Sequence, residues 1–588
     1  MKVFNVIFCF FILVSGLKAQ EPQSHTLTLP ATDALGRKLP THKEAGNIRA
    51  DRFVGMFYWT WHTHFARNPS HDLSKFLTEY PHALKNVNDP AWPATGEYFH
   101  WGEPLFGYYR DTDEWVLRKH AEMLGEAGID VIVFDCTNGS FTWKESYMQL
   151  CNVFSKARKD GVKTPQIAFM LAFGPTEESK KAIEEIYADL YKPGIYKDLF
   201  FMWKGKPLIM AYPDNLSPEL RQYFTFRPGQ PVYNEGPWRE DHWGWLEIYP
   251  QHKFGARIDG SCEQMTVGVS QNWSAEKGLS AMNAPNTFGR SYTHAKGQNT
   301  DTEAVNYGLN FQEQWDHALK ADPEFIFITG WNEWVAGRQI EWQGQKNAFP
   351  DQFDQEKSRD IEPMKGGHGD NYYYQMIANI RRFKGMPGEA ELSAPNEHIR
   401  INGKFDDWEN VLPEYRSHKG NTLHRDSEGF KGTFYRDSSG RNDIVRAKVA
   451  HDTKNLYFYV ETAENFTPSK DPKWMRLLID TDRSKNSGWE GYDFILNRLS
   501  PSKKNAVLEK CNSNKWSWTK AGLVKYRMAG NRMEIQIPLQ LLGLMPGAID
   551  IEFKWSDNMQ EEGNIMDFLV HGDVAPMGRF NYVYRSAK

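Results

Sequence analysis

The sequence predicts two folds in series, an α/β barrel of parallel strands followed by an all-β antiparallel sandwich. Short apolar runs alternate with helical or irregular stretches over residues 51–385. Residues 386–398, MPGEAELSAPNEH, hold two prolines and no apolar period, which is typical of a linker. Strand patterns dominate residues 399–588, where helical patterns are scarce. A chain of 588 residues is also too long for a single core.

Eight strand candidates occur before the linker. Most are near-continuous apolar runs, as expected for parallel strands covered on both faces. Helices are predicted at 114–127 and 303–320, whereas strands five to seven lack clear intervening helices. Eight such strands fit a (β/α)8 TIM barrel. A doubly wound open sheet is the alternative, weakened because no Gly-rich phosphate loop follows a strand. The candidates are residues 53–59, 130–136, 166–173, 207–212, 223–227, 243–249, 264–271 and 325–331.

The first 20 residues predict a cleaved signal peptide. Lys2 precedes an apolar run that ends in small residues near Ala19, which is the pattern of a secretory signal. The run is too short to cross a bilayer, and no later run approaches the required length. We therefore expect a secreted or periplasmic protein with no membrane span, and an N-terminal extension at residues 21–50.

Cysteine usage and charge narrow the class of partner. Four cysteines remain after residue 20, without any CxxC pair, so they predict neither a zinc site nor a disulfide framework. The net charge of -5 is small for this length and no basic stripe is present, which argues against nucleic acid as a partner. No metal or cofactor is predicted, and the oligomeric state is left open.

Aromatic residues make up 14% of the chain, including 21 tryptophans. Aromatic faces pack well on sugar rings, while Trp and Tyr add a polar handle. Many of these tryptophans lie in polar, loop-like sequence, so sugar binding is preferred over a purely structural role. The composition therefore favours a polysaccharide or oligosaccharide as the partner.

Polar and aromatic residues gather where the predicted strands end. Active sites of parallel barrels lie at the carboxyl ends of the strands, so these residues are expected to share one rim. Amides and acids bind hydroxyls, and aromatics pack on ring faces. The predicted substrate-binding residues are Trp59, Trp61, His62, Tyr212, Arg227, Gln271, Asn272, Trp331, Asn332 and Trp334.

Glu333 is the leading catalytic candidate because it follows the last apolar strand between Trp331 and Trp334. Neighbours of low polarity would raise its pKa, as a general acid at neutral pH requires. The alternative is a structural carboxylate held in a salt bridge by Arg338 or Arg290.

The segment FITGWNEWVAGRQIEW, residues 327–342, resembles the strand-eight motif of glycoside hydrolase family 99, the endo-α-1,2-mannosidases and mannanases, and of related 71/99-like proteins. The resemblance extends loosely over residues 50–385 and implies a glycosidase barrel. In that family a first glutamate lies in the NEW segment and a second lies three residues later. Glu333 matches the first position, but Ala336 occupies the second. The resemblance therefore supports the superfamily better than family 99 activity.

Glycoside hydrolysis usually needs two carboxyl groups, so Glu333 requires a partner on another strand. Glu247, near the end of strand six, is the first choice, and Asp135, at the end of strand two, is the second. Asp135 has a structural alternative as an acceptor for amides at the strand end. Glu341 and Glu235 are loop candidates of lower weight.

Two patterns suggest metals without meeting their requirements. His62 and His64 lie two residues apart, but no third zinc ligand stands out. The acidic run from Asp351 to Glu362 offers oxygen ligands, but it lacks the spacing and glycine of an EF-hand. We interpret the run as a solvated or arginine-paired surface.

The last part of the chain alternates with a period of two and holds turn signals such as DTKN, as an antiparallel sandwich does. INGKFDDW, DTKNLYFYV, LLIDTD and IEFKWSDN resemble segments of family 9-like carbohydrate-binding modules, which are related to DOMON domains. That resemblance implies sugar binding between aromatic residues, although strand tryptophans also fill sandwich cores. The candidate platforms are Trp474, Trp489, Trp516, Trp518 and Trp555.

Two hypotheses about function follow. The first is an exported glycoside hydrolase of the 71/99-like type that uses two carboxylates at the barrel rim. The second is a non-catalytic glycan-binding protein with a degenerate barrel, marked by Ala336. A hydrolase with a serine nucleophile ranks below both because no GxSxG elbow is present.

Overall fold

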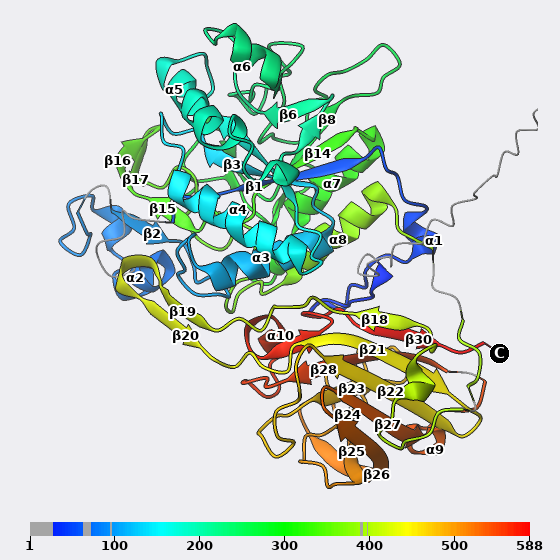
Figure 1. Cartoon of the computed structure of the whole chain (residues 1–588). Coiled ribbons are helices and arrows are strands. Elements are labelled where there is room, and N and C mark those ends of the chain that lie inside the picture. The colour runs from blue at the N-terminus through cyan, green and yellow to red at the C-terminus, as the bar shows by residue number, and fades with distance from the viewer. Residues whose placement is uncertain are drawn as a thin grey trace, which may run out of the picture.

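The computed structural model describes residues 28–62, 72–94, 97–388, 392–396, 398–547 and 549–587. Figure 1 shows an α/β part above and a β part below, which contain residues 53–384 and 414–585 respectively. The predicted signal peptide lies outside the described residues, and so does part of the predicted linker.

A five-stranded parallel sheet forms the centre of the α/β part. Its order is β4-β3-β1-β14-β8, with every neighbouring pair parallel. Almost every residue of these strands is buried, because helices or loops cover both faces. The predicted α/β class with parallel strands is confirmed. The strands are β1 (Phe53–Tyr58), β3 (Val131–Cys136), β4 (Gln166–Leu171), β8 (Gln264–Gly268) and β14 (Phe325–Thr329).

Shorter parallel segments continue this sheet beyond β4. Met170 of β4 pairs with Met210, which follows β6 (Lys206–Ile209), and β6 pairs with β7 (Thr225–Phe226). The predicted strand 243–249 is wrong, because only Trp243 forms a bridge there, to Gly229. On the side of this segment that faces β8, a side-chain amide makes the hydrogen bonds that a neighbouring strand would make. Gln264 donates to the carbonyl of Gly244 at 2.9 Å and accepts from its N–H at 2.9 Å.

The helices begin and end where local chemistry favours it. The predicted helix 114–127 is confirmed as α3 (Glu114–Ala127), whose Asp113 cap accepts from the N–H groups of Trp115 and Val116. Gly128, with φ 81°, ends it. The predicted helix 303–320 forms only as α7 (Leu309–Ala321), after a short 3₁₀ turn, η5 (Ala304–Asn306). Residues 227–263, all described, contain no helix. The remaining long helices are α4 (Lys144–Lys159), α5 (Glu177–Ile186) and α8 (Asn371–Lys384).

An eleven-stranded antiparallel sheet forms the β part. The DTKN turn works as predicted, because the Asp452 carboxylate accepts from the N–H groups of Lys454 and Asn455. The sheet contains β18 (Glu414–Arg416), β21 (Ile444–His451), β22 (Asn455–Thr462), β23 (Arg476–Asp480), β24 (Phe494–Leu496), β25 (Asn505–Cys511), β26 (Trp518–Ala529), β27 (Arg532–Pro538), β28 (Asp550–Asp557), β29 (Asp573–Ala575) and β30 (Tyr582–Arg585).

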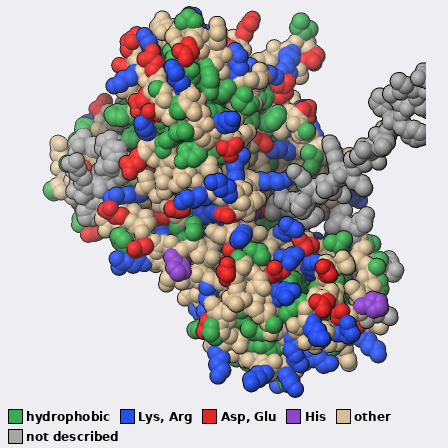
Figure 2. Space-filling view, viewed as in Figure 1, with side chains coloured by type: hydrophobic (Ala, Val, Ile, Leu, Met, Phe, Trp, Pro, Cys, Tyr) green, Lys and Arg blue, Asp and Glu red, His purple; other side chains and the backbone are tan. Residues whose placement is uncertain are grey.

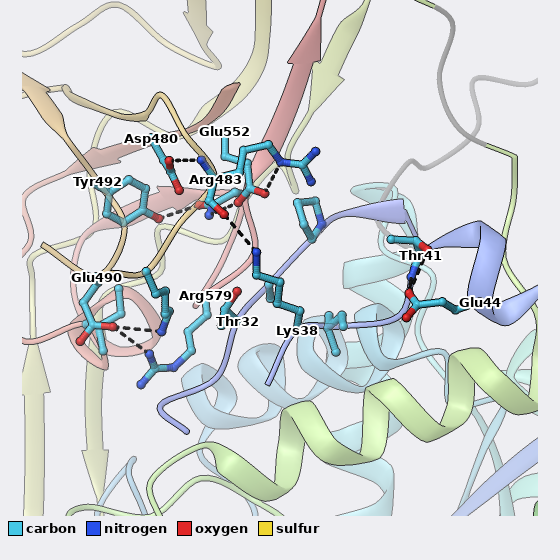
Figure 3. A pocket seen from close by; sticks show the side chains of 16 residues that line it. Thr32, Lys38, Thr41, Glu44, Asp480, Arg483, Glu490, Tyr492, Glu552 and Arg579 are labelled. Atoms are coloured by element: carbon cyan, nitrogen blue, oxygen red, sulfur yellow. Dashed lines mark hydrogen bonds and ion pairs between the residues drawn. The ribbon is translucent and has the colours of Figure 1, made fainter. Parts of the chain in front are cut away.

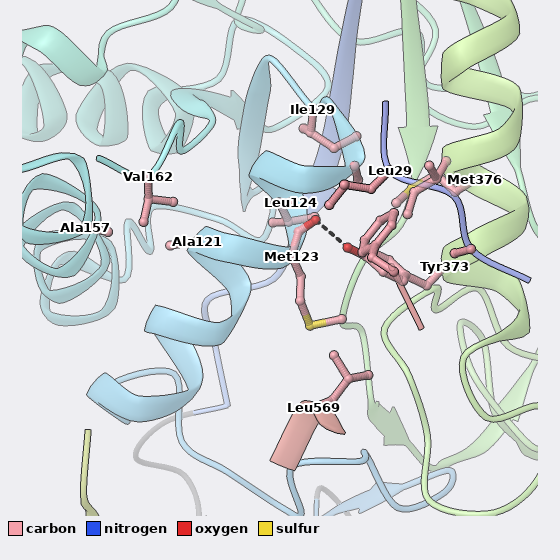
Figure 4. Close-up of a cluster of buried hydrophobic side chains, with 14 of the residues drawn as sticks. Leu29, Ala121, Met123, Leu124, Ile129, Ala157, Val162, Tyr373, Met376 and Leu569 are labelled. Atoms are coloured by element: carbon pink, nitrogen blue, oxygen red, sulfur yellow. Dashed lines mark hydrogen bonds between the residues drawn. The ribbon is translucent and has the colours of Figure 1, made fainter. Parts of the chain in front are cut away.

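The two parts share one continuous hydrophobic core. Leu569 of the β part packs in the same cluster as Leu124 of α3 and Met376 of α8 (Figure 4). In the same cluster Tyr373 donates to the carbonyl of Met123 at 2.8 Å. A hairpin of the β part, β19 (Arg425–Glu428) and β20 (Phe434–Asp437), also lies against the α/β part, where Gly429 bridges Tyr109. These contacts hold the two parts in a fixed arrangement.

Charges of both signs are mixed over the face shown in Figure 2, while Lys and Arg gather at the far end of the β part. Strands β25 and β26 and their flanking loops carry lysines 503, 504, 510, 515, 520 and 525. Within the described residues, every helix is too short or too polar to cross a bilayer.

Candidate active site

Glu333 lies just beyond the carboxyl end of β14. The chain there is tied to the end of β1, because Trp331 donates its N–H to the carbonyl of Phe57 at 2.9 Å. Asn332 adds two bonds to the backbone of Trp59, at 2.9 and 3.2 Å. The two residues before Glu333 are therefore hydrogen-bonded to the end of β1. Glu333 lies at the carboxyl end of the sheet, where the sequence predicts the site.

The Glu333 carboxyl is buried and has two polar partners. Only 4% of the residue is exposed, and its Oε2 accepts from Gln352 Nε2 at 2.7 Å and from Arg359 Nη2 at 2.9 Å. Burial raises the pKa of Glu333 well above its ordinary value, while the charge of Arg359 acts against that rise. The predicted rise in pKa is confirmed.

The arginine beside Glu333 is not one of the two expected from the sequence. Arg338 instead donates to Asn347 at 2.8 Å, and Arg290 donates to the carbonyl of Asp360 at 2.7 Å. The alternative of a carboxylate paired with arginine is therefore partly correct, with Arg359 as the partner.

Arg359 belongs to residues 351–362, which we call the strap. The strap runs beside the end of β14, where Gly330 donates to the carbonyl of Arg359 at 3.3 Å and Glu362 donates to the carbonyl of Trp331 at 3.0 Å. The sequence interpretation of this acidic run as a solvated or arginine-paired surface is correct for Asp351, which is exposed and pairs with Arg359, but wrong for Asp360 and Glu362, which are fully buried. Loop residues carry no periodic pattern, so the sequence offered no signal for this position beyond the arginine inside the run.

The strap also carries an exposed carboxylate close to Glu333. The side chain of Asp351 is 54% exposed, and its Oδ1 lies 3.3 Å from Arg359 Nη2, the nitrogen that also binds Glu333. Its charge raises the pKa of Asp135 as well, after the larger effect of burial. Asp351, which the sequence analysis missed as a catalytic candidate, is therefore close enough to the two predicted acids, Glu333 and Asp135, for its charge to raise the pKa of both.

Aromatic side chains form one wall of this group. Arg359 lies over the ring of Trp245, 6.0 Å from its centre, and the Tyr233 ring lies 5.5 Å from that of Trp245. Asn272 hydrogen-bonds the Tyr233 hydroxyl, and burial raises the pKa of that hydroxyl to about 12. Of the predicted binding residues, Asn272 thus lies on the wall of the Glu333 group.

A second aromatic group leads from Asp135 to the surface. Trp61 donates to Asp135 Oδ2 at 3.2 Å, and its ring stacks on Trp143 at 6.4 Å and 21°. Trp143 stacks in turn on Phe141, at 5.5 Å and 22°, and Phe141 is 57% exposed. We call Trp61, Trp143 and Phe141 the aromatic row. Only Trp61 was predicted.

Three predicted sugar-stacking tryptophans are instead part of the core. Trp59, Trp331 and Trp334 are at most 2% exposed, so their faces are covered by protein. Trp334 stacks on Trp101 at 4.7 Å and 17°. Asn332 is also fully buried and bonds to the backbone of Trp59 and the hydroxyl of Tyr109. These buried residues fix the backbone on either side of Glu333.

Glu362 of the strap is the centre of that support. It accepts from the Trp334 indole at 2.6 Å and from the Tyr109 hydroxyl at 2.8 Å, and its other oxygen lies 2.8 Å from His120 Nε2. Tyr109 also accepts from Asn332 at 3.3 Å. Both neighbours of Glu333 in the sequence are therefore fixed by one buried carboxylate, which the sequence analysis did not identify.

Other predicted residues lie apart from this group. The Glu247 carboxylate is buried and bonds to His252 Nδ1 at 2.7 Å. Arg227 forms a two-bond ion pair with Glu263, the residue before β8, and so lies near the amino end of that strand. Tyr212 and Gln271 bond to Gly229 and Asn310. None of the hydrogen bonds among the described residues joins these four to Glu333 or Arg359.

His62 is buried in a setting unsuited to charge. Burial and the nearby His120 lower the pKa of His62 to about 3, so its ring stays neutral in ordinary buffers. His64 lies outside the described residues. His62 remains a predicted binding residue, now as a neutral ring.

The predicted sugar platforms of the β part divide into two groups. Trp474, Trp489 and Trp555 are at most 3% exposed and belong to hydrophobic clusters, so they do not offer a free face. Trp516 and Trp518 are half-buried and lie edge to face at 5.3 Å. Only these two can present a ring surface to a sugar.

A polar cavity of about 200 Å³ lies where residues 30–44 meet the β part (Figure 3). Its charged groups are largely paired with protein atoms: Lys38 donates to the carbonyl of Arg483, and Glu490 accepts from Lys485 and Arg579. Asp480 lines the cavity, and burial together with Glu552 raises its pKa to about 8. Because these charged groups are paired within the protein, we interpret the cavity as part of a structural contact between residues 30–44 and the β part.

No protein-family model matches the chain, and no curated protein matches it significantly. Among solved structures, the N-terminal region is similar to the GH99 endo-alpha-mannosidase from Bacteroides thetaiotaomicron, at 15% identity and a TM-score of 0.31, over 57% of this chain and 97% of that one. The C-terminal region is similar to a family 9 carbohydrate-binding module from Caldicellulosiruptor kristjanssonii, at 13% identity and a TM-score of 0.18. The match covers 28% of this chain and 78% of that one.

A third match is the endo-beta-1,4-mannanase from Thermotoga petrophila, at 8% identity and a TM-score of 0.22, over 86% of this chain and 94% of that one. Since every TM-score is below 0.5, the function is argued from the site's own geometry.

Proposed function

We propose that the protein is an exported glycoside hydrolase that acts on a polysaccharide or oligosaccharide. The carrying observation is Glu333, a buried carboxyl of raised pKa that lies beside a second, exposed carboxylate at the carboxyl end of a parallel sheet. We assign the site to a (β/α)8 barrel over residues 51–385, followed by a sandwich over 399–588. Export rests on the signal-like residues 1–20.

Glu333 suits the role of general acid. Its raised pKa keeps a proton on the carboxyl at a pH where an exposed glutamate is ionised. Because Oε2 already accepts from Gln352 and Arg359, the proton is placed on Oε1. Arg359 then stabilises the carboxylate that remains after the proton has moved to the leaving oxygen.

The aromatic row suits the binding of a sugar chain beyond the cleaved bond. Phe141 offers an exposed ring at its outer end, and Trp61 touches Asp135 at its inner end. Sugar rings pack on such faces, so a longer chain gains contacts that a disaccharide lacks.

Replacing Phe141 with alanine is therefore expected to raise KM for long oligosaccharides about fivefold, because one stacked ring contributes on the order of 1 kcal/mol. The kcat and the KM for a disaccharide should stay unchanged. Leu523→Ala is the control, since Leu523 is 55% exposed on β26 of the β part. Steady-state kinetics against chain length measures the effect. An equal rise in KM for short and long substrates would contradict it.

A non-catalytic glycan-binding protein is the second candidate. Ala336 at the second family position and the ion pair of Glu333 with Arg359 favour it. A binder needs the aromatic row and the polar wall but no proton transfer, so the two functions differ in whether a bond is broken.

Turnover measurements on a panel of plant, algal and host glycans distinguish the two candidates. We expect the native protein to release reducing ends from at least one glycan, and Glu333→Gln to lower kcat at least about 100-fold, the usual contribution of a general acid. Glu263→Gln serves as a control, since Glu263 is a buried, arginine-paired glutamate at the other end of the sheet. Binding without turnover would favour the second candidate. Full activity in Glu333→Gln would remove Glu333 from the mechanism.

A further inference from the structure

Ala336 occupies the position of the family's second glutamate, and the tightly packed apolar residues around it leave no suitable place for a carboxylate. Ala336 is fully buried in β15 (Val335–Gly337), where it pairs with Phe99 of β2 (Tyr98–His100). Its cluster is apolar and includes Trp101 and Phe349. A carboxylate here would have to be buried without a charged partner, which is costly. The second acid must therefore come from another part of the chain.

Three other buried carboxyl groups could be considered as the second acid, and each already accepts hydrogen bonds from protein donors. Asp360 accepts from the Trp101 indole at 2.6 Å and lies behind the backbone of Glu333. Asp135 accepts from Thr137 and Trp61. The Glu247 carboxylate accepts from His252. These contacts orient each group toward protein donors.

Asp351 differs from these groups in exposure and in its single weak partner. More than half of its side chain is exposed, and its one ion pair among the described residues is the 3.3 Å contact with Arg359. We propose that Asp351 is the second catalytic carboxylate, which replaces the glutamate missing at position 336. This inference rests on the proposed hydrolase function.

The shared guanidinium nitrogen sets the distance between the two acids. Arg359 Nη2 lies 2.9 Å from Glu333 Oε2 and 3.3 Å from Asp351 Oδ1. These two oxygens are therefore at most about 6 Å apart, a limit that is compatible with the spacing of about 5–5.5 Å between the two carboxyl groups of retaining glycosidases. Asp351 is thus assigned as the nucleophile and Glu333 as the acid.

The reaction then proceeds in two balanced steps. An Asp351 oxygen forms a bond to the anomeric carbon while the glycosidic C–O bond breaks, and the Glu333 proton moves to the leaving oxygen. A water oxygen next attacks the same carbon, the Asp351 ester bond breaks, and Glu333 takes the proton from that water. The sugar leaves with the anomeric configuration of the substrate, and both side chains return to their starting states.

Asp351→Ala and Asp351→Asn test the assignment on the full chain. We expect both to lower kcat by more than about 1,000-fold, the order seen when a catalytic nucleophile is removed. Because the side chain is exposed, the melting temperature should stay unchanged. Sodium azide should restore turnover to Asp351→Ala and give a glycosyl azide of inverted configuration, since azide can occupy the vacated space. The product of the native protein should show retention by proton NMR.

Asp214→Asn is the matched control. Asp214 is also an exposed loop aspartate, 46% exposed, that pairs with an arginine, Arg239, at 3.0 Å. It should leave kcat unchanged. Full activity in Asp351→Asn while Glu333→Gln is inactive would overturn the Asp351 assignment alone, and so would an inverted product. Absence of turnover by the native protein would instead refute the hydrolase proposal itself.

Discussion

Replacing Arg359 with leucine is expected to lower the free energy of unfolding by about 3–5 kcal/mol at pH 8, because the change leaves the buried Glu333 without its charged partner. Arg359 and Glu333 have side chains that are only 1% and 5% exposed. Neither group can recover the lost interaction from water. Turnover should fall together with stability, since Arg359 also orients Asp351.

The loss should be smaller at pH 5 than at pH 8. Without Arg359 the folded-state pKa of Glu333 rises further, since its neighbours Asp351 and Asp360 both raise it. For a carboxyl whose folded pKa is raised, stability is fully present below the unfolded pKa of about 4.3 and is lost as pH rises toward the folded pKa. The loss accumulates at up to about 1.4 kcal/mol per pH unit over that window.

Urea unfolding at both pH values measures this dependence. In the control Arg359→Leu/Glu333→Gln the pH-dependent part should shrink to what Asp360 contributes, because glutamine does not ionise while Asp360, whose pKa is raised to about 7, also loses the charge of Arg359. The double variant should be less destabilised than the sum of the single ones. A loss of equal size at pH 5 and pH 8 in Arg359→Leu would mean that Glu333 does not sense the arginine charge.

The sequence could predict the elements whose pattern is local. Helix α3 was predicted at its observed bounds from the spacing of its apolar residues, and the five central strands appeared as apolar runs. The strand at 243–249 was predicted wrongly because an apolar run does not reveal that a side chain, Gln264, bonds its backbone. Such a bond joins distant residues and leaves no periodic signal.

The place of Glu333 after the last apolar strand identified it as a candidate site residue, but it did not identify the residues around it. Residues 330–334 lie beyond β14 and have no regular period, so the sequence could not show that Trp331 and Trp334 turn into the core while Glu333 faces Arg359. The strap supplies Asp351 and Arg359 from an irregular loop, where spacing has no fixed geometric meaning. Chemistry carried by loops is therefore the part of this site that required coordinates.

Away from the site, the substitution expected to lower the free energy of unfolding most is one in the contact between the β part and helix α8. Arg579 donates from Nε to Asp370 at 2.7 Å, and its own N–H donates to the Tyr374 hydroxyl at 2.6 Å. The side chains of Arg579 and Asp370 are 6% and 2% exposed, so this is a buried pair that joins the two parts of the chain. Asp370 is also the residue that precedes α8.

Arg579→Met is expected to cost about 3–5 kcal/mol, because it leaves the buried Asp370 unpaired. Since the parts share one hydrophobic core, both should unfold in a single transition in the native protein, whereas the variant should show two calorimetric transitions. Arg436→Met is the control, because Arg436 and Asp426 form an exposed pair at 3.0 Å with 78% and 72% exposure, and no change is expected. A single transition at an unchanged temperature in Arg579→Met would show that the shared core alone couples the two parts.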